Sequence, residues 1–494
     1  MHHLRENEQV MKLAALIDGL NVTRITGDGA VEITGITKDS RSAGRGSLFF
    51  ATKKSMAYIE EALRLGATAV AAEETPERPV PCLILTPDVD ELLGNVAARF
   101  FGMPSKDLFV AGITGTNGKT TTTFLMESMA REAGRNAGVI GTISYRYGGQ
   151  VLSAPNTTPG AVELHGLLQE MRLAGTEIVA MEVSSHALDQ KRVEGIDFDM
   201  AIFTNLTQDH LDYHKTMEEY KEAKTLLFTR YLEMSAKKRK YAVLNLDDPE
   251  VAVFQPGLNV RTLTYSIHEE ADAFLVSGTE TIDGLSLRVS LRGETMDLRS
   301  GLVGMFNASN ILAACLFGYG AALPREAIQK GVEHLTGVPG RLERVANGQG
   351  ISVFVDYAHT PDALQKVLGL LGRLKTGRLI VVFGCGGDRD AAKRPIMGGI
   401  ASHLADFSIV TSDNPRSEKP EKIVKEIVSG FNGGPFKTIE NRRDAITEGL
   451  SMARPGDVVL IAGKGHEDYQ IIGDRTLHFS DREVAEEYLN VAHG

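Results

Sequence analysis

The sequence predicts an α/β protein of three domains, and three observations lead to that prediction. The chain has 494 residues, enough for about three domains of ordinary size. Short apolar runs alternate with segments whose apolar residues recur at helical spacing, the pattern of a doubly wound parallel sheet. Several of these runs end in polar residues, and ligands bind at the carboxyl ends of strands in such sheets.

Residues 1–105 predict a small N-terminal α/β domain. Its expected helices are residues 13–20 and 58–65, and its expected strands are residues 31–36, 69–72 and 83–85. The segment shows no obvious nucleophile or metal cluster, so we expect a binding domain. Ser40 lies in an Asp-Ser-Arg turn after strand 31–36. This turn either holds a phosphate or a uracil edge or is only a polar connection, and the sequence leaves both interpretations open.

Residues 106–337 predict a central domain organised around one glycine-rich stretch. The stretch reads Gly-Ile-Thr-Gly-Thr-Asn-Gly-Lys-Thr-Thr-Thr over residues 112–122, between an apolar run and a segment of helical spacing. Strand, glycine-rich turn and helix are the context that a phosphate-binding loop (P-loop) requires. We therefore expect a P-loop ATPase-type sheet in which Lys119 reaches the terminal phosphates of ATP and the Thr120 hydroxyl binds Mg²⁺.

The loop is expected to bind phosphate mainly through its backbone. Glycines allow an anion to approach closely, and the N–H groups at the start of the helix point toward it. Ile113 stands where the strict pattern has its first glycine, but an ordinary glycine-rich turn is disfavoured because Gly-Lys-Thr opens a helix. The nucleotide-binding residues expected in this loop are Gly115, Thr116, Asn117, Gly118, Lys119, Thr120 and Thr121.

Other strand ends of the central domain carry candidate metal ligands. The expected strands are residues 178–181, 200–203 and 241–244. Glu182 directly follows the first strand and His210 lies shortly after the second, so both are predicted to meet Thr120 at Mg²⁺. Each residue taken singly is more often a structural polar residue. Lys224 lies on the expected helix 217–228, where a lysine is usually a solvated surface charge.

Residues 338–494 predict a C-terminal domain with a Rossmann-like sheet. Its expected strands are residues 353–355, 379–383, 407–410 and 458–462, and each ends in polar residues. The turn at residues 384–387 lacks the full glycine spacing of a dinucleotide-binding fingerprint. We therefore expect no nicotinamide or flavin site.

Composition narrows the classes of function. Basic residues number 53 and acidic residues 64, and a net charge of −11 argues against a general nucleic-acid or membrane-surface role. The three cysteines are far apart and form no metal-ligand pattern. Residues 1–8 lack the apolar core of a signal peptide, and no apolar run is long enough to span a bilayer. We therefore expect a cytoplasmic protein without membrane insertion.

A P-loop between two α/β domains is consistent with three classes of protein: an ATP-driven ligase or kinase, a nucleotide-dependent switch, and a motor. A motor usually shows an apolar strand ending in Asp-Glu, which this sequence lacks. Arg192, Arg389 and Arg416 lie just past strand ends or in loops, where they can hold several anionic groups. These arginines favour the ligase or kinase over the switch.

Four motifs together closely resemble the Mur ligases of cell-wall synthesis, and a fifth narrows the resemblance to one branch. They are Thr-Gly-Thr-Asn-Gly-Lys-Thr at 114–120, Asn-Thr-Thr at 156–158, Glu-Val-Ser-Ser-His at 182–186, Asp-Tyr-Ala-His-Thr-Pro at 356–361 and Asp-Asn-Pro-Arg at 413–416. The last motif is similar to that of the branch that adds meso-diaminopimelate, and addition of L-lysine is the alternative. Folylpolyglutamate synthetases share the P-loop variant but neither the N-terminal segment nor the Asp-Asn-Pro-Arg motif.

The resemblance implies an activity. ATP would phosphorylate a D-glutamyl carboxylate of UDP-MurNAc-L-Ala-D-Glu, and the amine of meso-diaminopimelate would attack the acyl phosphate to give an amide, ADP and phosphate. Lys119 and Mg²⁺ would neutralise the charge as these anions approach. Two small-molecule substrates, a monomer and a role in peptidoglycan precursor synthesis are implied as well.

The resemblance also implies roles for individual residues. Lys119, Lys224 and His210 are the catalytic positions, and Lys224 falls at the family's carbamylated lysine, whose negative charge could help to hold Mg²⁺ together with Thr120, Glu182 and His210. Ser40 binds UDP. The muramoyl-dipeptide positions are Asn156, Thr157, Thr158, Ser184, Gln190 and Arg192. Further nucleotide contacts are Asn307, Arg341 and Asp356. The diaminopimelate positions are Arg389, Asp413, Asn414, Pro415, Arg416, Gly463 and Glu467.

Overall fold

The computed structural model describes residues 10–491, so the expectation about residues 1–8 lies outside the described part of the chain. The chain forms two compact units. The first contains the chain up to Val276 together with Val289–Met296 and Ser309–Gly331, and the second contains Ser277–Arg288, Asp297–Ala308 and the chain from Val332 onward. The domain boundaries expected at residues 105 and 337 stay predictions.

The N-terminal part of the first unit is built on a sheet with the order β2-β7-β6-β5-β4. The strands are β2 (Arg24–Thr26), β4 (Gly35–Thr37), β5 (Ser47–Ala51), β6 (Ala67–Ala72) and β7 (Leu83–Leu85). The helices are α1 (Leu13–Ile17), α2 (Ile59–Leu65) and α3 (Val89–Phe100). Strands β4 to β7 are parallel, and the apolar faces of α1 and α3 share one core with them. The mixed α/β character predicted for this segment is confirmed.

Two sequence expectations in this part were wrong in detail. The run at 31–36 is not one strand, because β3 (Glu32–Ile33) pairs with β1 (Met11–Lys12), whereas β4 pairs with β5. The alternating pattern could not reveal that the two halves join different sheets. The helix expected over 13–20 ends at Ile17, and Gly19 then adopts a φ of +66°.

The central sheet has the strand order β11-β10-β9-β12-β8-β13-β14-β15-β16-β17-β18. The strands are β8 (Phe109–Thr114), β9 (Ala137–Ile140), β10 (Ser144–Tyr147), β11 (Gln150–Ser153), β12 (Ile178–Glu182), β13 (Met200–Phe203), β14 (Tyr241–Asn245), β15 (Arg261–Ser266), β16 (Ala273–Thr281), β17 (Gly284–Leu291) and β18 (Glu294–Ser300). From β9 to β16 neighbouring strands are parallel. The carboxyl ends of β12, β8 and β13 therefore meet at one edge.

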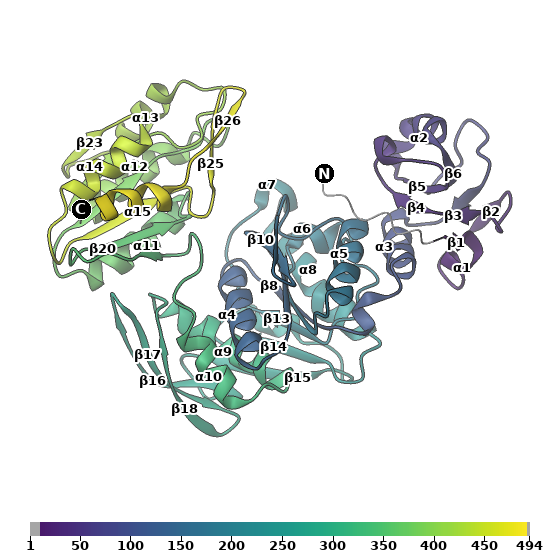
Figure 1. Cartoon of the computed structure of the whole chain (residues 1–494), viewed down its shortest axis with the longest axis horizontal. Coiled ribbons are helices and arrows are strands. Elements are labelled where there is room, and N and C mark those ends of the chain that lie inside the picture. The colour runs from purple at the N-terminus through teal and green to yellow at the C-terminus, as the bar shows by residue number, and fades with distance from the viewer. Residues whose placement is uncertain (1–9, 492–494) are drawn as a thin grey trace. The chain divides into compact units, whose positions relative to one another are not determined.

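Helices flank this sheet on both sides, as expected for a doubly wound fold. They are α4 (Lys119–Glu132), α5 (Ala161–Leu173), α6 (Ser185–Asp189), α7 (Leu211–His214), α8 (Met217–Leu226), α9 (Phe306–Gly320) and α10 (Arg325–Glu333). In Figure 1, α4 and α10 lie on one side of the strands and α5 and α8 on the other. The expected helix 217–228 is divided, because α8 continues as a π-helix over Leu227–Leu232.

The second unit contains a sheet with the order β19-β20-β24-β21-β22-β23, parallel except for β19. Its strands are β19 (Glu343–Val345), β20 (Ser352–Asp356), β21 (Leu379–Phe383), β22 (Phe407–Val410), β23 (Phe436–Thr438) and β24 (Val458–Ala462), with a hairpin of β25 (Tyr469–Ile472) and β26 (Arg475–His478). Its helices are α11 (Pro361–Leu374), α12 (Lys393–Leu404), α13 (Pro420–Val428), α14 (Arg442–Ser451) and α15 (Asp481–Val491). The predicted Rossmann-like sheet is confirmed.

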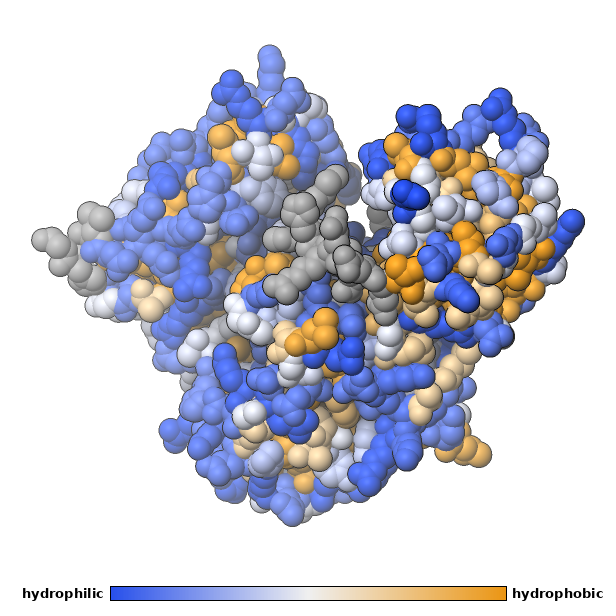
Figure 2. Space-filling view, turned by 45° about the vertical axis from the view of Figure 1, so that its right-hand side comes forward, coloured by the Kyte–Doolittle hydropathy of each residue, from blue (hydrophilic) through white to orange (hydrophobic). Residues whose placement is uncertain are grey.

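Figure 2 shows hydrophilic residues over most of one face, with apolar residues gathered mainly at the right of that view. In the described part of the chain, no helix combines the length and the apolar character needed to cross a membrane.

Helix α3 packs against the segment between β12 and β13 at two glycines, and neither position has room for a side chain. A methyl group on Gly94 would lie 2.8 Å from the carbonyl oxygen of Glu194, and one on Gly195 would lie 2.9 Å from the carbonyl oxygen of Gly94. Arg230 adds an ion pair with Glu91 of α3 at 2.9 Å and another with Glu194 at 2.9 Å. The close backbone approach therefore fixes α3 on the central sheet.

We predict that Gly94→Ala destabilises the protein by roughly 1–3 kcal/mol, because the new methyl group would clash with the backbone of Glu194, which can shift only at a cost in free energy. Gly369 in α11 is the matched control, since a methyl group there meets nothing within 4 Å. Gly369→Ala should stabilise by about 0.5–1 kcal/mol through helix propensity alone. Denaturant unfolding monitored by circular dichroism measures both changes, and a stabilised Gly94→Ala variant would contradict the packing argument.

Candidate active site

The glycine-rich loop joins β8 to α4 at the middle of the central sheet. Gly115 and Gly118 adopt φ angles of +146° and +88°, which side-chain residues rarely adopt. Added side chains would also clash with the Thr204 hydroxyl and the Asn310 amide, respectively. Gly118 caps α4, so the free N–H groups of the first helical turn face the loop, as phosphate binding requires.

The predicted phosphate-binding residues form one continuous turn. Lys119 folds back over the loop, and its ammonium donates to the carbonyl oxygens of Gly115 at 2.7 Å and Thr116 at 2.9 Å. The Asn117 N–H donates to the side chain of Asn205 at 3.0 Å, and Thr120 is buried at the helix start. Side-chain hydrogen bonds from Lys119 and to Asn205 thus fix the backbone of the loop, and the Lys119 ammonium lies against its carbonyls.

Lys224 is a core residue of this site, so the expectation that a lysine on this helix is solvated was wrong. Its side chain is 1% exposed, and its Nζ donates to the Gly115 carbonyl at 3.0 Å and lies 4.5 Å from the centre of the Tyr220 ring. Burial, together with the charge of Lys119, holds the pKa of Lys224 well below its ordinary value. Helical spacing could not reveal that this face of α8 covers the P-loop.

Glu182 places two buried carboxylate oxygens at the end of β12. The side chain is 1% exposed, and its two oxygens accept hydrogen bonds from the N–H and the hydroxyl of Thr142, both at 3.0 Å. Each oxygen keeps a lone pair, and carboxylate and hydroxyl oxygens are the ligands that Mg²⁺ prefers. Within residues 10–491 no three His, Cys, Asp or Glu side chains form a ready metal-binding group. Mg²⁺ needs fewer protein ligands than three, because phosphate and water oxygens complete its coordination shell.

His210 lies beside this set on an exposed turn. It adopts a φ of +54°, and its ring centre lies 5.0 Å from that of His186 and 6.0 Å from that of Tyr220. Tyr220 in turn donates to or accepts from the Thr116 hydroxyl at 3.1 Å. Aromatic rings therefore connect His210 to the P-loop and to Lys224.

The structure brings together most of the residues expected to hold the muramoyl-dipeptide. The Thr158 hydroxyl donates to the Glu182 carbonyl at 2.9 Å and accepts from the Ser184 N–H at 3.1 Å. The Arg192 guanidinium donates to the Thr158 carbonyl at 2.9 Å and to the Gln190 side chain at 2.8 Å. These four side chains form one polar network next to Glu182.

Sequence reasoning missed two members of this network. The Thr142 hydroxyl lies 3.0 Å from that of Thr157 and links it to Glu182, and the Tyr213 hydroxyl accepts from Gln190 at 3.0 Å. Thr142 comes shortly after the end of β9, so the rule that ligands bind at strand ends could have found it. Tyr213 lies in a helix of four residues and gave no such signal.

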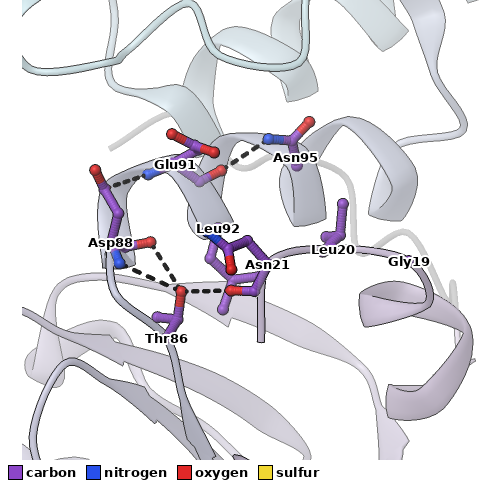
Figure 3. Close-up of a pocket in the computed structure, with 8 residues that line it drawn as sticks. All are labelled: Gly19, Leu20, Asn21, Thr86, Asp88, Glu91, Leu92 and Asn95. Atoms are coloured by element: carbon purple, nitrogen blue, oxygen red, sulfur yellow. Dashed lines mark hydrogen bonds between the residues drawn. The ribbon is translucent and has the colours of Figure 1, made fainter. Parts of the chain in front are cut away.

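A cavity of about 250 Å³ lies at the start of α3. Figure 3 shows Glu91 and Asn95 projecting from the helix, with Thr86 bonded between Asn21 and Asp88. Asp88 and Glu91 are both ion-paired with Lys191, which lies between Gln190 and Arg192 and adopts a φ of +52°. Two residues that line the cavity, Asp88 and Glu91, therefore hold the turn at residues 190–192, which carries the expected substrate contacts Gln190 and Arg192.

Ser40 and Asn156 are not part of the polar network next to Glu182. The Ser40 hydroxyl donates to Glu61 at 2.6 Å within the N-terminal part of the first unit. Beside it, Arg41 is ion-paired with Asp39 at 2.7 Å and holds the pKa of that carboxyl below its ordinary value. Asn156 is exposed, and its carbonyl accepts from the Tyr145 hydroxyl at 2.6 Å.

The second unit gathers the predicted amino-acid contacts at the carboxyl ends of β22 and β24. Asn414 donates to Glu467 at 2.9 Å and accepts from Lys464 at 3.2 Å. Lys464 is fully buried and also faces Glu467 at 3.4 Å, a role that the sequence did not suggest. Asp413 is buried beside them, and its Oδ1 accepts from the Asn414 N–H at 2.6 Å. The result is a compact group of acceptors for an amine.

Two arginines lie next to these acceptors. The Arg416 guanidinium donates to the Gly387 carbonyl at 2.8 Å, and an added Cβ at Gly386 would lie 2.9 Å from Arg416 Nη1 and 3.8 Å from Arg389 Cγ. Arg389 is exposed, and Arg416, just after Pro415, adopts a φ of +53°. Strained backbone of this kind concentrates at functional sites. The arginine guanidinium groups thus lie next to the carboxylates of Asp413 and Glu467, an arrangement that could bind both charges of a zwitterionic ligand.

The remaining expected nucleotide contacts also belong to the second unit. The buried Asp356 carboxylate accepts from the N–H groups of Leu342 at 2.6 Å and Ala358 at 2.8 Å, and burial raises its pKa. The Arg341 guanidinium lies 5.3 Å from the Tyr357 ring centre. The Asn307 amide donates to the Val303 carbonyl at 2.8 Å. Asp356 therefore shapes the turn that carries Arg341.

Comparisons with known proteins agree with this arrangement. Residues 113–318 match the Mur ligase middle domain, and residues 340–465 match the glutamate ligase domain of Mur ligases. A UDP-N-acetylmuramoyl-L-alanyl-D-glutamate--2,6-diaminopimelate ligase of Geobacter metallireducens is 44% identical over 96% of this chain and 97% of its own length. The protein of the same name from Halalkalibacterium halodurans is 42% identical over 97% and 99%.

Solved structures show the same relationship. A structure titled as this kind of ligase has a TM-score of 0.74 and 33% identity, covering 98% of this chain and all of that one. A folylpolyglutamate synthase of Mycobacterium tuberculosis, complexed with ADP, shares the fold with a TM-score of 0.60, 19% identity and 74% coverage of this chain. The chain belongs to the Mur ligase family. It is accordingly a ligase, and the family resemblance predicted from its motifs is confirmed.

We predict that Gly118→Ala weakens nucleotide binding at least about tenfold, because the new methyl group meets Asn310 and displaces the N–H groups of the loop. Gly134 at the other end of α4 is the matched control, since its φ is also positive (+69°) but nothing lies within 4 Å. Gly134→Ala should cost about 1 kcal/mol of stability and leave the affinity unchanged. Titration calorimetry with ADP would measure both, and equal affinities would contradict the assignment of the loop.

Proposed function

We propose that this protein is the cytoplasmic, monomeric ligase that joins meso-diaminopimelate to UDP-MurNAc-L-Ala-D-Glu in peptidoglycan precursor synthesis, using ATP and Mg²⁺. The observation that carries the proposal is the position of Arg416 and Arg389 around Gly386, next to the group of acceptors formed by Asp413, Asn414 and Glu467. The names of the relatives at 44% and 42% identity, which match almost the whole chain, support it.

Charge neutralisation is the main task in this reaction, because a carboxylate must approach a phosphate. The Lys119 ammonium, placed over the P-loop, would turn from the carbonyls of Gly115 and Thr116 to the terminal phosphates. A D-glutamyl carboxylate would then take the phosphoryl group and become an acyl phosphate. The amine of the second substrate would displace phosphate and form the amide.

Thr120, Glu182 and His210 would hold Mg²⁺, which supplies positive charge beside the phosphates when it is bound. The buried Glu182 oxygens fit this role, because each accepts one hydrogen bond from Thr142 and keeps a lone pair for a metal ion. Thr157, Thr158, Ser184, Gln190 and Arg192, with Asn156, would place the dipeptide next to Glu182, and Ser40 would contact UDP. Asn307, Arg341 and Asp356 would contribute further nucleotide contacts.

The choice between diaminopimelate and lysine depends on one carboxylate. Diaminopimelate carries a carboxylate beside its far amine, and lysine carries only the amine. Arg416 offers a planar group that can meet a carboxylate with two hydrogen bonds, and Glu467, Asp413 and Asn414 offer acceptors to the amine. Lysine would leave the arginine without an anion.

We predict that the wild type, given ATP, Mg²⁺ and UDP-MurNAc-L-Ala-D-Glu, ligates meso-diaminopimelate and uses lysine poorly. Arg416→Ala should lower kcat/KM for diaminopimelate at least about 30-fold, the effect of removing one partner of a buried charged pair. It should change the value for lysine much less, and Arg416→Lys should recover only part of the loss. Equal losses for both amino acids would show that Arg416 does not recognise the carboxylate, and efficient use of lysine by the wild type would overturn the proposed substrate.

We further predict that Lys224 carries a carbamate. A carbamate forms from CO₂ and a neutral amine with loss of a proton, and burial beside Lys119 favours the neutral amine by lowering the pKa of Lys224. Lys221, one turn earlier, is the matched control, because its bond to Glu250 raises its pKa and keeps it charged. In ¹³C-bicarbonate, NMR should show a carbamate signal that Lys224→Ala abolishes and Lys221→Ala retains. A plain amine at Lys224 in the active enzyme would contradict this prediction.

A further inference from the structure

A fully buried ion pair lies at the carboxyl edge of the sheet in the second unit. Arg442 begins α14 and Asp481 begins α15, and both side chains are 0% exposed. The guanidinium donates from Nε to Oδ1 and from Nη2 to Oδ2, both at 2.7 Å. This two-bonded geometry fixes the plane of the guanidinium.

The remaining donors of Arg442 reach two strand ends. Nη2 donates to the Ala462 carbonyl at 2.9 Å and Nη1 to the Ser412 carbonyl at 3.3 Å. Ala462 is the last residue of β24, and Ser412 lies two residues past the end of β22. These strands are not neighbours, because β21 lies between them. Arg442 therefore spans the end of β21 and ties together two loops that the sheet itself does not join.

The two loops are those that carry the expected amino-acid contacts. Ser412 directly precedes Asp413, and Ala462 directly precedes Gly463. Gly463 has a φ of +118°, and a Cβ there would lie 2.7 Å from Asp413 Oδ2 and 3.8 Å from Arg442 Nη2. The Asp413 carboxylate, the Gly463 backbone and the Arg442 guanidinium thus meet at one point.

Stability alone does not account for this pair. Removing two charges from water is costly, and apolar residues of similar volume often replace a buried ion pair without loss of stability. A guanidinium can, however, hold two carbonyls and a carboxylate in one plane, which no apolar side chain can do. The specific gain is the placement of the two loops.

We propose that Arg442 and Asp481 are positioning residues that set Asp413 and Gly463 in the geometry needed to bind the amino-acid substrate. Neither side chain touches that substrate. The inference rests on the proposed function only in taking residues 413–416 and 463–467 as the amino-acid site.

The test is the double variant Arg442→Met/Asp481→Leu, which removes both charges while keeping similar volumes. We expect it to fold, with KM for diaminopimelate raised at least tenfold and KM for ATP and UDP-MurNAc-L-Ala-D-Glu unchanged. Arg442→Lys should give an intermediate KM, because it keeps one charge but loses the planar group. The control is Arg378→Met, which breaks a pair with Asp457 at the opposite ends of β21 and β24. It should lower the melting temperature and leave every KM unchanged.

A folded double variant with an unchanged KM for diaminopimelate would overturn the inference, and so would an equal rise of all three KM values. If the double variant does not fold, hydrogen exchange of Asp481→Asn decides. Faster exchange confined to residues 412–416 and 463–467 would support positioning, and faster exchange throughout the second unit would overturn it. If the wild type uses lysine instead, the proposed substrate is wrong, and the same comparison is then made with KM for lysine.

Discussion

The carboxyl ends of the parallel strands impose one constraint on which both units depend. Each strand ends in carbonyl groups that the ladder no longer pairs, and a buried unpaired carbonyl is costly. In this protein side chains satisfy several of them: Asn245 donates to the Thr204 carbonyl at 2.7 Å, and Tyr265 donates to that of Phe203 at 2.9 Å. The Thr158 hydroxyl does the same for the Glu182 carbonyl at 2.9 Å, so at the end of β12 one hydrogen bond both closes the strand and belongs to the candidate site.

The P-loop shows the chemical consequence of that constraint. Two lysines converge on the Gly115 carbonyl, Lys119 at 2.7 Å and Lys224 at 3.0 Å. Two ammonium groups sharing one acceptor repel each other, and the more deeply buried Lys224 is the one whose charge is disfavoured. The shared carbonyl thus holds two lysines in different environments, and burial lowers the pKa of Lys224.

In the second unit, guanidinium groups donate to the unpaired carbonyls at and beyond the strand ends. Arg442 donates to carbonyls at two strand ends, and the buried Arg394 donates to the Gly386 carbonyl at 3.2 Å while its Nη1 and Nη2 groups are also ion-paired with Glu418 and Glu426. Arg416 donates to the Gly387 carbonyl. A planar group with five donors can satisfy backbone carbonyls and still have donors left over.

The sequence by itself determined the α/β class, the P-loop and the positions of the strands whose ends carry Glu182, Asp413 and Gly463, because these depend on local periodicity and on short motifs. It could not decide that Lys224 is buried, since spacing defines a helical face but not the element that covers it. Nor could it reveal that the run at 31–36 joins two sheets or that Arg442 reaches two strands. Those outcomes depend on contacts between residues far apart in the chain, and only the tertiary structure brings such residues together.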